Sequence, residues 1–363
     1  MTLFTHGTGR TPQRRILAGL ALAAGAALTL SACSTGAAGD THEGALRVVA
    51  TTTQLTDFAG EVGGDDIKLT GLLPAGGSAH HFDPTPADLL ALSEADVLIV
   101  NGAGLEAFID DAIDASGFDG KLITASDGID LAEAEEISGE GSGGEGAEHD
   151  HAEDGHSEAD EADEAGDEHD HDHGPVNPHL WTSPRNAAGM VETIATGLAA
   201  ADPAHAADFE QRAADYANQL TELDTWIAAQ FAAIPEADRV LVSGHDSLRY
   251  YLHDYDIAFA GSLLPSFEDN AEPSAADIDA LVAAIKEQGV RAVFVESSMS
   301  PKLARTIAKE AGVEVVDAES LYADSLGAPG SGADTYVTAT INNTRVILEA
   351  WGATPAELPA TLQ

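Results

Sequence analysis

The sequence predicts an α/β protein of two lobes, each a mostly parallel sheet flanked by helices, with one long rigid helix joining the lobes. Short apolar segments alternate with amphipathic segments in both halves of the chain, which is typical of parallel sheets covered on both faces by helices. Between the halves, apolar residues recur in steps of three and four residues over 204–234. The length of 363 residues is sufficient for two such lobes.

The first lobe is expected to cover 46–203. Its strands are the apolar or β-branched segments 46–53, 66–73, 97–101 and 121–124. Its helices are expected at 54–62, 86–95, 105–115 and 184–201. The loop after the second strand is rich in glycine and proline and leads to His80. This histidine is therefore expected at the carboxyl end of the sheet, where parallel sheets bind ligands.

A long helix over 204–234 is expected to link the lobes. At ~1.5 Å per residue it would span on the order of 45 Å, which suits a spine between two lobes, and a core helix of the second lobe is the alternative. The second lobe, 235–363, repeats the alternating pattern. Its strands are expected at 240–243, 257–260, 290–296 and 313–317, and its helices at 274–288, 301–311 and 334–351. His245 directly follows the first of these strands, and Asp324 follows the last.

The N-terminus has the features of an exported lipoprotein. A basic segment precedes the apolar stretch 16–30, which is too short for a comfortable membrane span. Small residues then lead to Cys33, the only cysteine, in a pattern that resembles a bacterial lipobox. We therefore expect a signal peptide over 1–32, lipidation of Cys33, a flexible tether over 33–45, and anchoring to the outer face of the cell membrane. The paired Arg14 and Arg15 match a twin-arginine signal poorly, which favours ordinary secretion.

A segment of different composition, 139–174, interrupts the first lobe. Between residues 140 and 172 it has fifteen Asp or Glu and no Lys or Arg. It also holds six histidines: His149, His151, His156, His169, His171 and His173. Almost nothing in it can pack, which predicts disorder. A solvated linker would account for the acidic residues but not for the histidines, so we expect weak accessory metal binding here.

His179 stands just after this insertion, between Pro178 and Trp181. Proline fixes its own φ and restricts the preceding residue, which stiffens the chain at this point. A histidine on a stiff turn suits a metal ligand, and a capping histidine after a loop is the alternative. The formal net charge of −46 fits the binding of cations, although an acidic surface also serves solubility. It argues against nucleic acid as a partner, because phosphate contacts need clustered Lys and Arg.

Four residues at loop positions have side chains that suit a zinc ion in tetrahedral geometry: His80, His179, His245 and Asp324. The motifs around them resemble the substrate-binding lipoproteins of bacterial ABC importers for zinc and manganese, the ZnuA-like cluster A-I solute-binding proteins. The matching motifs are 79–84 with 88–89, 177–181, 243–246, 272–274 and 324–327. The resemblance implies that the four residues are the metal ligands in a cleft between the lobes. It also implies a monomer that delivers its cargo to an ABC transporter membrane permease with its ATPase.

Zn(II) is the expected transported ligand. Manganese-type members of the resembled family commonly have a glutamate where this chain has His245, and the additional nitrogen favours zinc over Mn(II). The histidine-rich insertion is also typical of the zinc branch. The alternatives are a manganese- or iron-specific binding protein of the same type, and a surface zinc-storage or adhesion lipoprotein. A zinc hydrolase is not expected, because the chain has no His-Glu-x-x-His motif and four protein ligands leave no open position for water.

Overall fold

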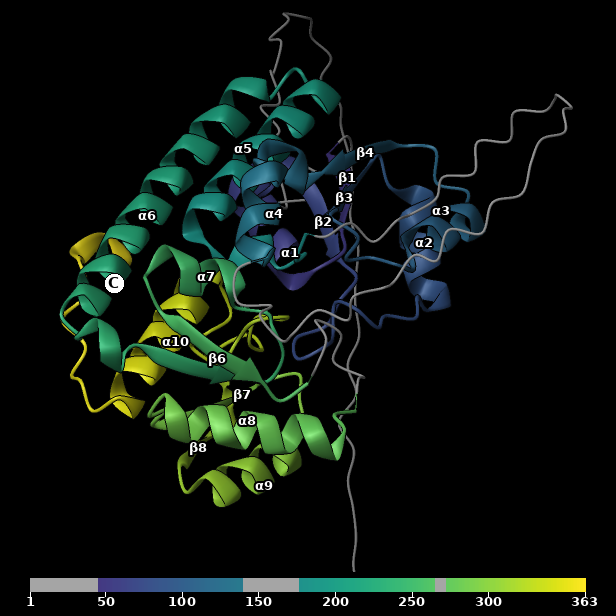
Figure 1. Cartoon of the computed structure of the whole chain (residues 1–363). Helices are drawn as coiled ribbons and strands as arrows, with labels where there is room; N and C mark the ends of the chain where they lie inside the picture. The colour runs from purple at the N-terminus through teal and green to yellow at the C-terminus, as the bar shows by residue number, and fades with distance from the viewer. Residues whose placement is uncertain (1–44, 140–175, 265–271) are drawn as a thin grey trace, which may run out of the picture. The chain divides into compact units, whose positions relative to one another are not determined.

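The computed structural model describes residues 45–139, 176–264 and 272–363 (Figure 1). The predictions for the signal peptide, for Cys33 and for the six histidines of the insertion fall outside these residues. The predicted domain boundaries stay predictions. Among the helices that the structure describes, none combines the length and the apolarity of a membrane span.

The first lobe is built on a four-stranded parallel sheet in the order β2-β1-β3-β4. Its strands are β1 (Leu46–Ala50), β2 (Ile67–Gly71), β3 (Val97–Val100) and β4 (Lys121–Thr124). Its helices are α1 (Thr53–Gly63), α2 (Pro86–Glu94), α3 (Ile109–Ser116), α4 (Leu131–Gly139) and α5 (Pro184–Ala201). Because side chains alternate along a strand, Val48 packs in the core that includes α1 and α5, while Val49 packs with α2 and α3 on the other face.

The second lobe repeats this arrangement with the strand order β6-β5-β7-β8, again all parallel. Its strands are β5 (Val240–Ser243), β6 (Ala258–Ser262), β7 (Ala292–Glu296) and β8 (Glu314–Leu321). Its helices are α7 (Arg249–Asp254), α8 (Ala275–Glu287), α9 (Pro301–Ala311) and α10 (Tyr336–Ala350). Strand β8 is longer than expected, and its pairing with β7 is irregular between Phe294 and Glu296.

The long helix is present as α6 (Ala206–Ala232). It packs against α1 and α5 of the first lobe and against α10 of the second. Figure 1 shows it running beside α5. Its apolar face is buried: Phe209, Ala213, Tyr216, Leu220, Leu223, Ile227 and Phe231. The prediction of two lobes bridged by one helix is therefore confirmed, and the alternative of a helix belonging to the second lobe alone is not supported.

Asp57 lies where α1, α6 and α10 meet. Its Oδ2 accepts hydrogen bonds from the Tyr216 hydroxyl at 3.1 Å and from the backbone N–H of Tyr336 at 3.0 Å. Burial raises the pKa of Asp57 to about 6 in spite of these two bonds. The folded state therefore holds this proton to a higher pH than the unfolded state, where the Asp pKa is about 3.9. Consequently, the stability contributed by this carboxyl falls as pH rises from about 4 to about 6.

We expect Asp57→Asn to raise the melting temperature of the metal-free protein at pH 7.5. One amide oxygen can accept both hydrogen bonds without burying a charge, and the pKa shift corresponds to at most about 3 kcal/mol. At pH 5, which lies midway through the range in which this carboxyl loses its stability, the gain should be only about half as large. Thermal unfolding at both pH values tests this, with the exposed Asp119→Asn as the matched control. Equal melting temperatures for Asp57→Asn and wild type at pH 7.5 would contradict the expectation.

Candidate metal centre

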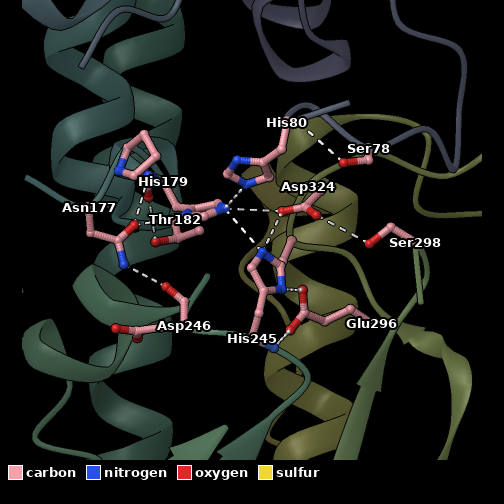
Figure 2. A network of polar contacts seen from close by, with 12 residues as sticks. Ser78, His80, Asn177, His179, Thr182, His245, Asp246, Glu296, Ser298 and Asp324 are labelled. Atoms are coloured by element: carbon pink, nitrogen blue, oxygen red, sulfur yellow. Dashed lines mark hydrogen bonds and ion pairs between the residues drawn. The ribbon is translucent and has the colours of Figure 1, made fainter. Parts of the chain in front are cut away.

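The four predicted ligands come together at one point between the two sheets (Figure 2). His80 lies in the loop between β2 and α2, and His179 immediately precedes a short 3₁₀ helix, Leu180–Thr182, that leads into α5. His245 follows β5, and Asp324 follows β8. One ligand atom from each residue lies within 4.8 Å of all the others. Each lobe thus contributes two of the four side chains.

The spacing of these atoms suits a small cation. His179 Nε2 lies 3.0 Å from His80 Nε2 and 3.2 Å from His245 Nε2. Asp324 Oδ1 lies 3.2 Å from His179 Nε2 and 3.1 Å from His245 Nε2. A tetrahedral zinc ion with bonds of ~2.0–2.1 Å separates its ligands by ~3.3 Å. Asp324 Oδ1 is buried against the imidazole nitrogens of His179 and His245, so a cation at the centre of the cluster would face the carboxylate oxygen and the ring nitrogens together.

The four residues differ in their exposure. His179 and His245 are completely buried and Asp324 is 1 % exposed, whereas His80 is only partly buried. His80 therefore lies on the part of the site that is nearest to solvent. His81, next in sequence, is exposed and does not belong to the cluster.

Asn177 orients the imidazole of His179. Its Oδ1 accepts hydrogen bonds from the backbone N–H of His179 at 3.1 Å and from Nδ1 of the ring at 2.7 Å. The proton of the neutral imidazole is therefore on Nδ1, and the lone pair of Nε2 faces the centre of the cluster. The Asn177 amide is itself fixed, because its Nδ2 donates to the carbonyl of Asp246 at 2.5 Å.

Glu296, the last residue of β7, holds His245 in the same way. Its Oε1 accepts from the backbone N–H of His245 at 3.0 Å, and its Oε2 lies 2.7 Å from Nδ1 of the ring. Carboxylate–histidine pairs of this kind orient metal-binding imidazoles and raise their basicity. Gly244 permits the approach, because a Cβ there would lie 2.9 Å from Glu296 Oε1 and 2.3 Å from Met299 Sδ.

The charges of the cluster stabilise one another. Burial alone would lower the pKa of His245, but the carboxylates of Asp324 and Glu296 outweigh it and hold this pKa well above its usual value. Burial alone would raise the pKa of Asp324, but the imidazoles of His245 and His179 hold it well below its usual range. Ser298 Oγ donates to Asp324 Oδ2 at 3.2 Å, so Oδ1 is the carboxylate oxygen that faces the histidines.

The supporting residues Asn177, Glu296 and Ser298 were not among the sequence predictions. Asn177 lies within a motif that the sequence analysis singled out, two residues before His179. Glu296 had a usable signal, because it is a charged residue at the end of an apolar strand that runs parallel to the strand before His245. Ser298 had no such signal.

Comparison with known proteins identifies relatives along almost the whole chain. The family model described as "Zinc-uptake complex component A periplasmic" (ZnuA) matches residues 48–350. The manganese-binding lipoprotein MntA of Bacillus subtilis (strain 168) is 29% identical over 328 residues, which are 90% of this chain and 96% of MntA. The manganese ABC transporter substrate-binding lipoprotein PsaA of Streptococcus pneumoniae is 25% identical over 342 residues, which are 93% of this chain and 98% of PsaA.

Solved structures show the same fold. The periplasmic zinc-binding protein TroA of Treponema pallidum superimposes with a TM-score of 0.69 at 23% sequence identity, covering 85% of this chain and 99% of TroA. This similarity confirms the predicted architecture of two parallel sheets bridged by a long helix.

Proposed function

This chain belongs to the ZnuA family of metal-binding components of ABC importers, and we propose that it captures its cargo ion with His80, His179, His245 and Asp324. The convergence of these four side chains from two lobes carries the proposal. Members of the family bind a metal ion and pass it to a transporter and are not enzymes, so the prediction against a hydrolase is confirmed at the level of the family. The cargo is a divalent ion that is released to a membrane permease with its ATPase.

We propose Zn(II) as the ion that this site holds most tightly. Three imidazole nitrogens and one carboxylate oxygen suit zinc, whereas manganese prefers sites richer in oxygen. Any site of nitrogen and oxygen ligands also binds Zn²⁺ more tightly than Mn²⁺, which stands at the weak end of the first-row series.

Manganese is the second candidate for the bound ion. The names of the relatives found by sequence favour manganese over zinc. Both relatives described above carry manganese in their names. Metal availability as well as affinity decides which ion a binding protein carries in the cell. Titration with each metal in competition with a chelator tests the two candidates. Equal or tighter binding of Mn(II) than of Zn(II) would overturn the zinc assignment.

The same comparison supports a location outside the cytoplasm. Both relatives are named lipoproteins, and this chain has the lipobox-like pattern that ends at Cys33. We therefore propose that a lipid on Cys33 anchors a monomeric protein to the outer face of the cell membrane.

The insertion histidines would add weak sites that gather metal near the centre. Calorimetry on a chain lacking 140–174 should show loss of weak equivalents and retention of the tight site.

Metal affinity should fall steeply as pH is lowered. The imidazoles must be neutral to bind a metal, and their reference pKa is about 6.5. In the metal-free protein the pKa of His245 is raised, so protons already compete with the metal at higher pH than for an ordinary histidine. We expect apparent zinc affinity to drop between about pH 7 and pH 5. Chelator competition measures it, and an affinity that stays constant over this window would contradict the histidine ligands.

A further inference from the structure

Side chains of the first lobe form hydrogen bonds with the backbone on both sides of Asp324, at Ala323 and at Leu326. The carbonyl of Ala323 accepts one bond from Gln54 Nε2 at 2.8 Å and a second from Trp181 Nε1 at 2.9 Å. On the other side of Asp324, the backbone N–H of Leu326 donates to Thr53 Oγ1 at 2.8 Å. The segment 323–326 belongs to the second lobe by sequence, yet its backbone is held by side chains of α1 and of the turn after His179.

These bonds form a continuous network through Gln54. The Thr53 hydroxyl accepts from Leu326 and donates to Gln54 Oε1 at 3.0 Å, while the other end of the Gln54 amide donates to Ala323. Each hydrogen bond along this path runs from an N–H or O–H group to an oxygen acceptor. Gln54 is only 2 % exposed, so both ends of its amide depend on these partners. Buried hydrogen bonds that are linked in this way favour one arrangement of the groups they join.

We propose that Gln54 is a positioning residue for the metal ligand Asp324. The Asp324 side chain is short, so the position of its backbone limits where its carboxylate can lie, and the network through Gln54 helps to hold that backbone. Within the described residues, the hydrogen bonds of the Gln54 amide go to Thr53 and Ala323, so it acts on the metal through the segment 323–326. The carboxylate ligand is therefore in place only when the two lobes are in contact. This inference rests on the proposed metal-binding function.

The test is the replacement Gln54→Met, which keeps the length of the side chain and removes its amide. Ala323 keeps the bond from Trp181, so the fold should tolerate the change. We expect zinc affinity, measured by chelator competition at pH 8, to fall by about ten- to a hundredfold, as for other residues that orient metal ligands. The visible absorption of bound Co(II) should shift toward that of Asp324→Ala.

A thermodynamic cycle separates positioning from a merely structural effect. In the background of Asp324→Ala, the change Gln54→Met should weaken zinc binding by less than about twofold, because the ligand through which it acts is already gone. The matched control is Gln230→Met in α6, where a buried glutamine bonds Trp226 and Ala356 instead. It should change the melting temperature and leave zinc affinity unchanged.

Two outcomes would overturn the inference: wild-type affinity in Gln54→Met, or the same loss of affinity with and without Asp324. If Gln54→Met does not fold, Gln54→Glu replaces it, since a carboxylate keeps the shape but cannot donate to Ala323. Failure of the proposed function looks different, because then wild type itself would bind no zinc in the same assay.

Discussion

Replacing either His80 or His245 by alanine should abolish most of the thermal stabilisation that zinc gives to the wild-type protein. A ligand that binds only the folded state adds about 4 kcal/mol when its concentration is a thousand times Kd. The two histidines come from different lobes, yet they lie around the same point. Loss of either leaves an incomplete set of ligands, so both substitutions should have the same large effect. Differential scanning calorimetry with and without zinc measures it.

The chain provides matched controls for both substitutions. His81 is adjacent to His80, and His253 lies in the helix that follows His245, and both are exposed. Alanine at either position should preserve the zinc-induced rise in melting temperature. A rise that survives in His80→Ala but not in His245→Ala, or the reverse, would mean that the site does not draw on both lobes.

The elements that the sequence predicted well have strong and long patterns. The apolar face of α6 recurs along a helix of 27 residues, and β1 ends in three consecutive buried residues, Val48, Val49 and Ala50. Helix α4 was missed because only Ala134 and Ile137 of its nine residues are buried, so its periodicity is weak. The sequence placed His253 in a helix, but the six residues of α7 are too few for a helical period to give its bounds.

The same reasoning explains what could be predicted of the metal centre. His80, His245 and Asp324 follow predicted strands, and the carboxyl ends of parallel strands lie at one edge of a sheet. The contact between His245 and Glu296 needs more information. It exists because β5 lies beside β7 in the sheet, which the order of the strands along the chain does not reveal. The pairing of Gln54 with Ala323 depends likewise on how the two lobes meet.

Glu296→Gln should weaken zinc binding by about ten- to a hundredfold, the usual cost of removing a group that orients a metal ligand. Glu296 receives two N–H groups, both from His245, one on each carboxylate oxygen. A glutamine of the same shape has one acceptor oxygen and one NH₂ group. Either the backbone N–H or the ring Nδ1–H of His245 must then face the NH₂ group of the glutamine. That group of His245 loses its hydrogen-bond acceptor. Chelator competition at pH 8 measures the loss.

The exposed Glu287→Gln in α8 makes the same chemical change far along the chain from any ligand and should leave zinc affinity unchanged. The melting temperature of the metal-free Glu296→Gln protein reports on folding separately. Burying a charge is costly, so removal of this carboxylate need not destabilise the metal-free fold. Weaker zinc binding together with an unchanged or higher metal-free melting temperature would show that Glu296 serves the metal site. Zinc affinity within twofold of wild type would show instead that the ring of His245 is held in place by packing alone.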